Sequence, residues 1–140
     1  MKFLHVCLCL IILIATSACS KQSIPPKPDT DGLKESPRLV LNGSEFDIIK
    51  SHMKKWAVVK GKVFDVFEPK SGKVLNLNMG PNYKRCFKAV IFPGSYSKWA
   101  GGKDYLKSLQ GKTVIIEGSI EEYMDSPQII VNSATQLKVE

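Results

Sequence analysis

The clearest chemical feature of this chain is a concentration of positive charge in its middle third. Twelve Lys and Arg side chains fall within residues 54–107, against three acids, whereas the 140-residue chain as a whole has a formal net charge of +7. A surface of this kind attracts polyanions such as nucleic acid, anionic glycans or lipid headgroups. The alternative is a lysine-rich face that only keeps the protein in solution.

Catalytic chemistry is not indicated. After the first 18 residues the chain has a single histidine, His52, and Cys86 has no His or acid near it in a recognisable catalytic pattern. Glu121, Glu122 and Asp125 gather near a turn, but their spacing is not that of a calcium loop, so we interpret them as a solvated acidic loop. We expect no enzyme activity, no metal and no cofactor, and a buried structural thiol at Cys86.

The N-terminus reads as a targeting segment. Lys2 precedes an apolar run, residues 3–15, that is shorter than the roughly 20 residues a bilayer span needs. The run is followed by Thr16-Ser17-Ala18-Cys19, which resembles the lipobox of bacterial lipoproteins. The resemblance implies that Cys19 carries the lipid, palmitate among its acyl chains. An ordinary secretory signal, also cleaved after Ala18, is the alternative.

The resemblance to lipoproteins divides the chain into three parts. Residues 1–18 are the signal peptide, residues 19–43 the lipidated Cys and a flexible Pro-rich tether, and residues 44–140 the folded domain. It implies a lipid-anchored protein of the bacterial cell envelope. Ser20 rather than Asp follows the lipidated Cys, which favours the periplasmic face of the outer membrane over the inner membrane.

The domain is rich in short β-type runs separated by turn residues. Five strands are expected, at Val58–Phe67, Lys73–Met79, Cys86–Phe92, Thr113–Ile120 and Pro127–Asn132. In the second run, residues 75, 77 and 79 are apolar and share one face of the strand, opposite Asn76 and Asn78. Gly61 and Gly118 interrupt the first and fourth runs and predict bends there.

Two short helices are expected beside these strands. One begins at Ser44, which we take as its cap, and ends near Lys55. The other runs from about Lys103 to Leu109 and is ended by Gly111. Five strands with a helical link between the third and the fourth are the arrangement of an oligonucleotide/oligosaccharide-binding (OB) barrel.

Several segments carry a closer likeness. They are Val59–Val63, Leu75–Leu77, Phe87–Phe92, Leu109–Val114, Gly118–Ile120, Tyr123 and Pro127–Val131. With these segments, residues 44–139 resemble a small bacterial OB-fold domain of the kind that stands alone behind a signal peptide or beside nuclease-like domains. The resemblance implies an all-β fold: a five-stranded OB-like Greek-key barrel with a short N-terminal helix and a short helix between strands 3 and 4.

The OB fold also indicates where a ligand would bind, because OB barrels bind ligands across strands 2 and 3, between the 1–2 and 4–5 loops. Cations there would neutralise phosphates, an aromatic ring would stack on a base, and amides would bond base edges or sugars. The candidate ligand-binding residues are Lys62, Phe64, Lys73, Asn76, Asn78, Lys84, Arg85, Lys88 and Tyr123. The alternatives are a core position for Phe64 and Phe92, a solvated strand face for the asparagines, and lysines that only solubilise.

We therefore expect a membrane-tethered OB-fold binding module of the bacterial envelope. Its partners would be the membrane, through the lipid anchor, and single-stranded nucleic acid or another polyanion such as an anionic glycan. The alternatives are a structural or adaptor lipoprotein that binds another envelope protein or peptidoglycan, and an accessory domain to a nuclease.

Overall fold

The computed structural model describes residues 38–140. The expected signal peptide, Cys19 and residues 20–37 of the tether lie outside the described residues. The strands are β1 (Val40–Asn42), β2 (Trp56–Lys62), β3 (Asp65–Phe67), β4 (Leu75–Asn78), β5 (Lys88–Ile91), β6 (Thr113–Ser119), β7 (Glu121–Tyr123), β8 (Ser126–Ile130) and β9 (Leu137–Val139). The helices are α1 (Phe46–Lys50), α2 (Gly102–Lys107) and two 3₁₀ segments, η1 (Pro93–Lys98) and η2 (Ala134–Gln136).

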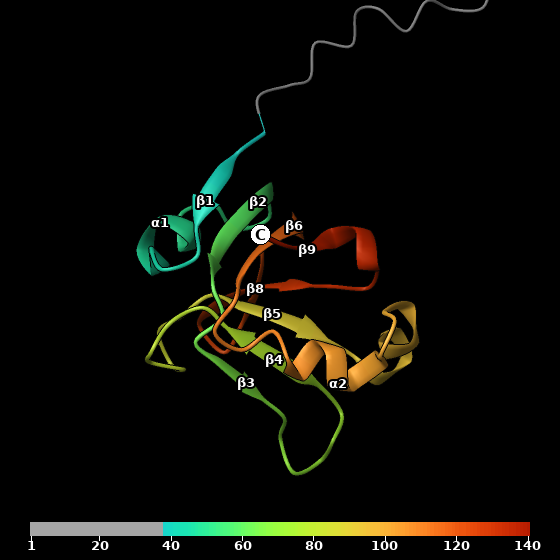
Figure 1. Cartoon of the computed structure of the whole chain (residues 1–140). Coiled ribbons are helices and arrows are strands. Elements are labelled where there is room, and N and C mark those ends of the chain that lie inside the picture. Colours follow the sequence, from blue (N-terminus) through green and yellow to red (C-terminus); the bar gives the residue numbers. More distant parts are fainter. Residues whose placement is uncertain (1–37) are drawn as a thin grey trace, which may run out of the picture. The chain divides into compact units, whose positions relative to one another are not determined.

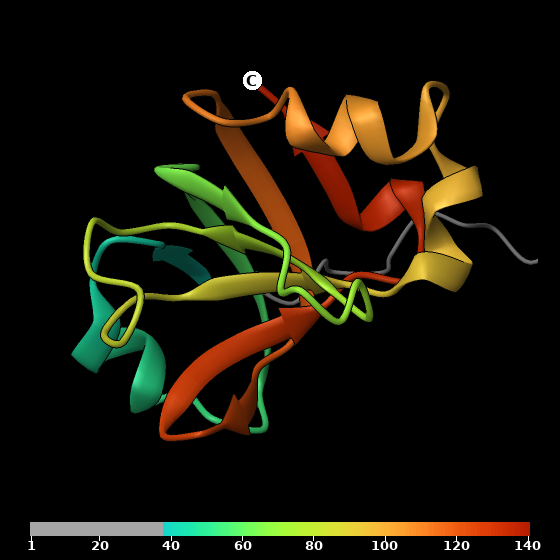
Figure 2. The same cartoon turned by 90° about the horizontal axis from the view of Figure 1, so that it is seen from below.

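These strands form two sheets. One has four strands in the order β1-β2-β6-β9, and the other has five in the order β3-β4-β5-β8-β7. Figures 1 and 2 show α1 near one end of the strands and η1 with α2 near the other. In this part of the chain, no helix is long and apolar enough to cross a membrane.

The first expected strand is divided between the two sheets. The backbone N–H of Val63 donates to Lys112 O (2.9 Å), beside β6, whereas that of Phe64 donates to Asn78 O (2.8 Å), on β4. The chain therefore changes sheets at the Val63–Phe64 peptide. The expected bend exists, but it lies two residues beyond Gly61, which pairs with Val114 in an unbroken register.

The fourth expected strand changes sheets in the same way. Ile120 still exchanges backbone bonds with Lys54 and Lys55 beside β2, at 2.8 and 2.9 Å. The next residue, Glu121, already pairs with Gln128 of β8. The bend expected at Gly118 therefore lies at the Ile120–Glu121 peptide.

Gly61 and Gly118 are needed for close approach and not for bending. A Cβ on Gly118 would lie 2.6 Å from Cγ2 of the buried Ile129, and one on Gly61 would lie 2.9 Å from Met79 Sδ and 3.2 Å from Gly43 Cα. Such separations are below ordinary van der Waals contact, so the sheets could not pack as closely with larger residues here.

The strand order confirms the expected OB-like fold. If β2 with β3 counts as strand 1 and β6 with β7 as strand 4, the neighbours run 1-2-3-5-4 and strand 4 pairs back onto strand 1. Strands 3 and 5, which are β5 and β8, run parallel, as the Greek-key crossover through α2 and β6 requires. The hydrogen bonds nevertheless divide into two sheets, so the expected continuous closed barrel is not formed.

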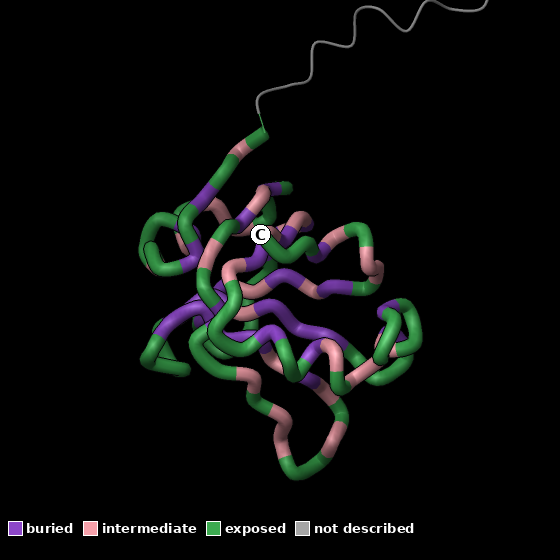
Figure 3. The backbone as a smooth tube through the Cα atoms, viewed as in Figure 1, coloured by how far each residue is buried: buried purple, intermediate pink, exposed green. Residues whose placement is uncertain are grey.

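The core lies between the two sheets and beneath α2. Strand β6 alternates strictly between buried and half-buried residues, and the expected apolar face of β4 is buried, with Leu75 and Leu77 at 0 % exposure. Figure 3 shows that the buried residues lie mainly in the strands and that many loop residues are exposed.

The helices differ from the sequence expectation at their ends. The first begins at Phe46 and ends at Lys50, short of Lys55, and Ser44 does not cap it; Ser44 instead donates from its N–H and its hydroxyl to Asn42 Oδ1. Helix α2 begins one residue before the expected span, at Gly102, and ends two residues short of it, at Lys107. Gly111 follows in a left-handed conformation (φ 83°), as a C-terminal stop requires.

Candidate functional site

The outer surface of the five-stranded sheet, here called the outer face, is defined by strand register. Because the residues buried in the core are Leu77, Ala89 and Ile129, their neighbours along each strand point outward. One outward row is Asp65, Asn78, Lys88, Gln128 and Glu121, and the next is Phe67, Asn76, Val90 and Ile130. The outer face thus combines a polar row with an apolar one, although Val90 in the middle of the apolar row is buried, at 5 % exposure.

Two phenylalanines are exposed on the outer face. Phe67 of β3 is 51 % exposed and pairs with Asn76, which in turn pairs with β5. Phe92 follows β5 and is 44 % exposed, so the core position considered for it is wrong. Asn76, half-buried, lies on the strand between them, and the three residues together offer two stacking rings and an amide.

Phe64 is also outside the core, at 45 % exposure. Its ring lies 6.0 Å from Lys62 Nζ, a cation–π distance, at the point where the chain changes sheets. The sequence pattern predicted a binding role for Phe64 but not for Phe67. The alternation of residues along β3 places Phe67 on the outer face, but this alternation can be counted only when the bend after Val63 is known.

The cations of the loop before β5 are placed differently from the expectation. The Arg85 guanidinium donates to both oxygens of Asp47 on α1 (3.0 and 3.1 Å) and lies 5.2 Å from the Phe46 ring. Its charge is therefore already neutralised within the chain. Lys84 lies 5.8 Å from the ring of the exposed Tyr83, so this aromatic–cation pair is available at the same loop.

Lys73 and Lys88 remain the simplest cations for a ligand on the outer face. Lys73 is exposed in the loop that joins β3 to β4, and Lys88 is half-buried in the middle of the polar row. In the part of the chain that the structure describes, neither forms an ion pair.

Asn78 is not available to a ligand as the sequence suggested. It is 2 % exposed, and Cys86 Sγ lies 4.0 Å from its Oδ1. The cause is the loop between β4 and β5. This loop packs so closely that a Cβ on Gly80 would lie 2.8 Å from Cys86 Cβ. Cys86 is buried as expected, and burial raises the pKa of its thiol above the ordinary value, so the thiol stays protonated.

Tyr123 lies at the far edge of the outer face from Phe67. It belongs to β7, is 60 % exposed, and precedes a turn in which Met124 and Asp125 have φ of 49° and 61°. Asp125 forms an ion pair with Lys50 of α1, which fixes the turn. Four strand spacings separate β3 from β7, or about 19 Å, so the predicted residues are spread across a broad surface and do not converge on one pocket.

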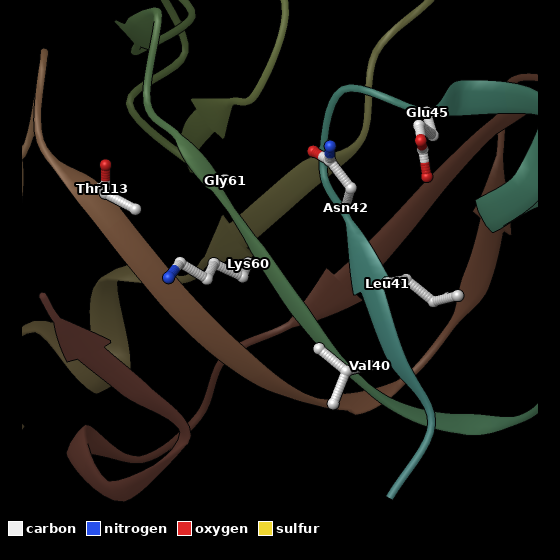
Figure 4. A pocket seen from close by; sticks show the side chains of 7 residues that line it. All are labelled: Val40, Leu41, Asn42, Glu45, Lys60, Gly61 and Thr113. Carbon is white, nitrogen blue, oxygen red and sulfur yellow. The ribbon is translucent and has the colours of Figure 1, made fainter.

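A hollow of about 450 Å³ lies on the other sheet, lined by Val40, Leu41, Asn42, Glu45, Lys60, Gly61 and Thr113 (Figure 4). Its lysine is already paired, because Lys60 Nζ lies 2.5 Å from Glu140 Oε1. No group of three His, Cys, Asp or Glu residues that could hold a metal is found within residues 38–140.

The search of solved structures found several similar chains, and the three described here have TM-scores below 0.5. Asparaginyl-tRNA synthetase from Pyrococcus horikoshii matches with a TM-score of 0.42 and 17 % identity over 64 % of this chain and 20 % of that one. The OB domain of a Methanosarcina mazei protein matches with a TM-score of 0.45 and 20 % identity, over 71 % of this chain and 82 % of that one. Aspartyl-tRNA synthetase from Entamoeba histolytica gives a TM-score of 0.45 and 14 % identity over 94 % of this chain and 28 % of that one.

The chain spans about a fifth to a quarter of the length of the synthetases it matches. No protein-family model matches the sequence, and the search of curated proteins found no match.

Proposed function

We propose that the domain binds single-stranded nucleic acid, or a similar polyanion, on the outer face. The observation that carries the proposal is the pair of exposed rings, Phe67 and Phe92, on either side of Asn76. Aromatic rings on an open β-surface stack bases of any sequence, and each stacked base contributes about 1–3 kcal/mol.

The charges beside these rings support the same ligand class. Lys73 and Lys88 carry no intramolecular partner charge among the described residues, so they can neutralise phosphates without first breaking an ion pair. Asp65 and Glu121 stand at the two ends of the polar row. Because these two carboxylates repel phosphates, we expect the backbone of a bound strand to cross the apolar row, between the two rings.

The test is a binding titration of the purified protein with a 12-nucleotide oligo(dT), an RNA of the same length and a heparin-type glycan. Fluorescence anisotropy at low and moderate salt should show binding to the two nucleic acids that weakens as salt is added. Tighter binding of the glycan would change the ligand class to anionic sugars. No binding to any of the three at low salt would exclude the proposal.

We further propose that this module is held at the bacterial envelope by a lipid on Cys19. The support is the Thr16-Ser17-Ala18-Cys19 sequence after an apolar run. Replacing Cys19 with Ser should release the protein from the membrane fraction or leave its precursor uncleaved. If both proteins fractionate as soluble and processed, the chain has an ordinary secretory signal.

A second candidate function is docking of another envelope protein on the four-stranded sheet. Val40 and Trp56 are 63 % and 62 % exposed there, with the half-buried Val58 paired to Val40. If oligonucleotides do not bind, loss of partner capture in a Trp56→Ala variant would favour this adaptor role.

A further inference from the structure

The loop that joins β3 to β4 (residues 68–74) is tied to α2 through its only acid, Glu68. Glu68 Oε1 accepts from Lys103 Nζ, and Oε2 lies 3.1 Å from Lys107 Nζ, so each carboxylate oxygen has its own lysine. The two lysines stand four residues apart on α2, a spacing that places both side chains on one side of the helix. The Glu68 side chain is 22 % exposed, against 37 % and 48 % for the lysines.

This corner of the molecule has more donors than acceptors. Tyr96 of η1 lies close enough to Glu68 and Lys103 for their charges to act on it, and its buried hydroxyl has no hydrogen-bond partner among the described residues. Burial and the charge of Glu68 raise the pKa of Tyr96, so the hydroxyl remains a donor. The Nε1 of Trp99, which follows η1, is likewise buried with no partner in the part of the chain that is described.

We propose that Lys103 and Lys107 form a phosphate site that Glu68 occupies from within the chain, and that a bound polyanion displaces Glu68 from it. The inference rests on the proposed function. A carboxylate that gives one oxygen to each of two lysines is the arrangement that two oxygens of a phosphate would adopt. Glu68 is thus an internal competitor for the site.

The position of the site connects it to the outer face. Glu68 directly follows Phe67, so the site lies at the rim of that face, where the loop with Lys73 begins. Partly exposed ion pairs are stabilised only weakly in water, so a phosphate can replace the carboxylate at little cost. Displacement would free the loop from α2 and add two cations to the surface that a bound strand meets.

The matched test compares Glu68→Gln with Glu140→Gln. Both variants remove one negative charge that is paired with a lysine, but Glu140 is bonded to Lys60 on the four-stranded sheet. With a 12-nucleotide oligo(dT), Glu68→Gln should bind severalfold more tightly than the wild type at low salt. The slope of log affinity against log salt should change little, because the wild type makes the same two phosphate contacts once Glu68 is displaced. Glu140→Gln should leave the affinity nearly unchanged.

A triple variant and a free phosphate probe complete the test. Adding Lys103→Ala and Lys107→Ala to Glu68→Gln should lower the affinity below that of the wild type and reduce the slope of log affinity against log salt by about 1.4, because two phosphate contacts of about 0.7 each are lost. In the wild type, inorganic tripolyphosphate should shift the NMR amide signals of residues 68–74 and 103–107 together, a result that does not depend on any variant folding.

The outcomes separate this inference from the proposed function. If the wild type binds oligo(dT) but Glu68→Gln binds no better than Glu140→Gln, or more weakly, Glu68 only positions the loop and the inference is wrong while the function stands. Absence of amide shifts with tripolyphosphate also overturns it. If no protein binds oligo(dT), the proposed function and the inference fail together.

Discussion

The two sheets of this domain bear different kinds of surface. On the four-stranded sheet several charges are used within the chain: Lys60 pairs with Glu140, Arg38 with Glu117, and Trp56 Nε1 donates to the same Glu117 at 3.2 Å. On the five-stranded sheet, exposed rings stand beside lysines that have no ion-pair partner among residues 38–140.

The difference teaches that net charge is a poor guide to where a small basic domain binds. Both sheets carry lysines, but only those without an internal partner can exchange counterions for phosphates at no loss of protein contacts. We therefore expect substitutions in one sheet to change binding and substitutions in the other to change stability.

The largest effect is expected from removing the two rings of the outer face. Phe67→Ala with Phe92→Ala should weaken oligo(dT) binding at least tenfold, since each stacked base contributes about 1–3 kcal/mol. The urea midpoint should move little, because both rings are about half exposed. Trp56→Ala, which removes a ring of 62 % exposure from the other sheet, is the control. Equal losses of affinity from the two proteins would erase the distinction between the sheets.

A loss of stability, and not of binding, is expected from a substitution at Gly118, on the inner side of the four-stranded sheet. Gly118→Ala would place a Cβ 2.6 Å from Ile129 Cγ2, a branched side chain that cannot move aside, and should lower the free energy of unfolding by about 1–3 kcal/mol. Gly61→Ala should cost less, because its nearest contact is the flexible Met79 side chain. A urea melt of the two variants measures the order, and a neutral Gly118→Ala would show that β6 and β8 can separate.

A smaller effect is expected from paired lysine substitutions, which compare the two sheets at constant charge. Lys73→Ala with Lys88→Ala should reduce the slope of log affinity against log salt by about 1.4, the value for two phosphate contacts. Lys112→Ala with Lys138→Ala removes the same charge from around the four-stranded sheet and should leave the slope nearly unchanged. If the slopes fall equally, binding depends on net charge alone.

The smallest effect concerns pH and the tie between the loop and α2. Hydrogen bonds from Lys103 and then Lys107 lower the pKa of Glu68, and the Glu68 bond raises the pKa of Lys103. The stabilisation is therefore fully present above about pH 4.5, the ordinary pKa of a glutamate, and is lost as pH falls through the lowered value.

A comparison of two proteins isolates this small contribution. Between pH 7 and pH 3 the urea midpoint of the wild type should fall slightly more than that of Glu68→Gln. The pKa of Asp125 is also lowered, by Lys50, but it changes both proteins equally. Parallel curves would mean that the tie adds nothing to stability.

Much of the fold was predictable because alternation and turn residues are local. The apolar positions of β4 and the left-handed Gly111 after α2 follow from neighbouring residues, and the structure agrees with them. The positions where the chain changes sheets were predicted wrongly because neither Val63 nor Phe64 is a turn residue. The bends arise because successive peptides hydrogen-bond to strands of different sheets.

The candidate site was less predictable because its charges are decided by distant residues. Arg85 meets Asp47, 38 positions away in the sequence, and no local pattern announces that pair. Asn78 follows the alternation of its strand, but the loop after it buries the side chain. The predicted Lys73, Lys88 and Asn76 remain candidates because none of them is fully buried, and neither lysine forms an ion pair within residues 38–140.

The exchange of strands between the sheets has a consequence for the order of folding. The meander β3-β4-β5 pairs residues that are close in sequence, such as Asp65 with Asn78, whereas β2 must wait for β6, as Trp56 pairs with Ser119. Because closing long loops slows folding, we expect the meander to gain hydrogen-exchange protection before β2 and β6 do. For that interval the nascent domain would expose the inner side of its five-stranded sheet, so its yield on refolding should fall as protein concentration rises.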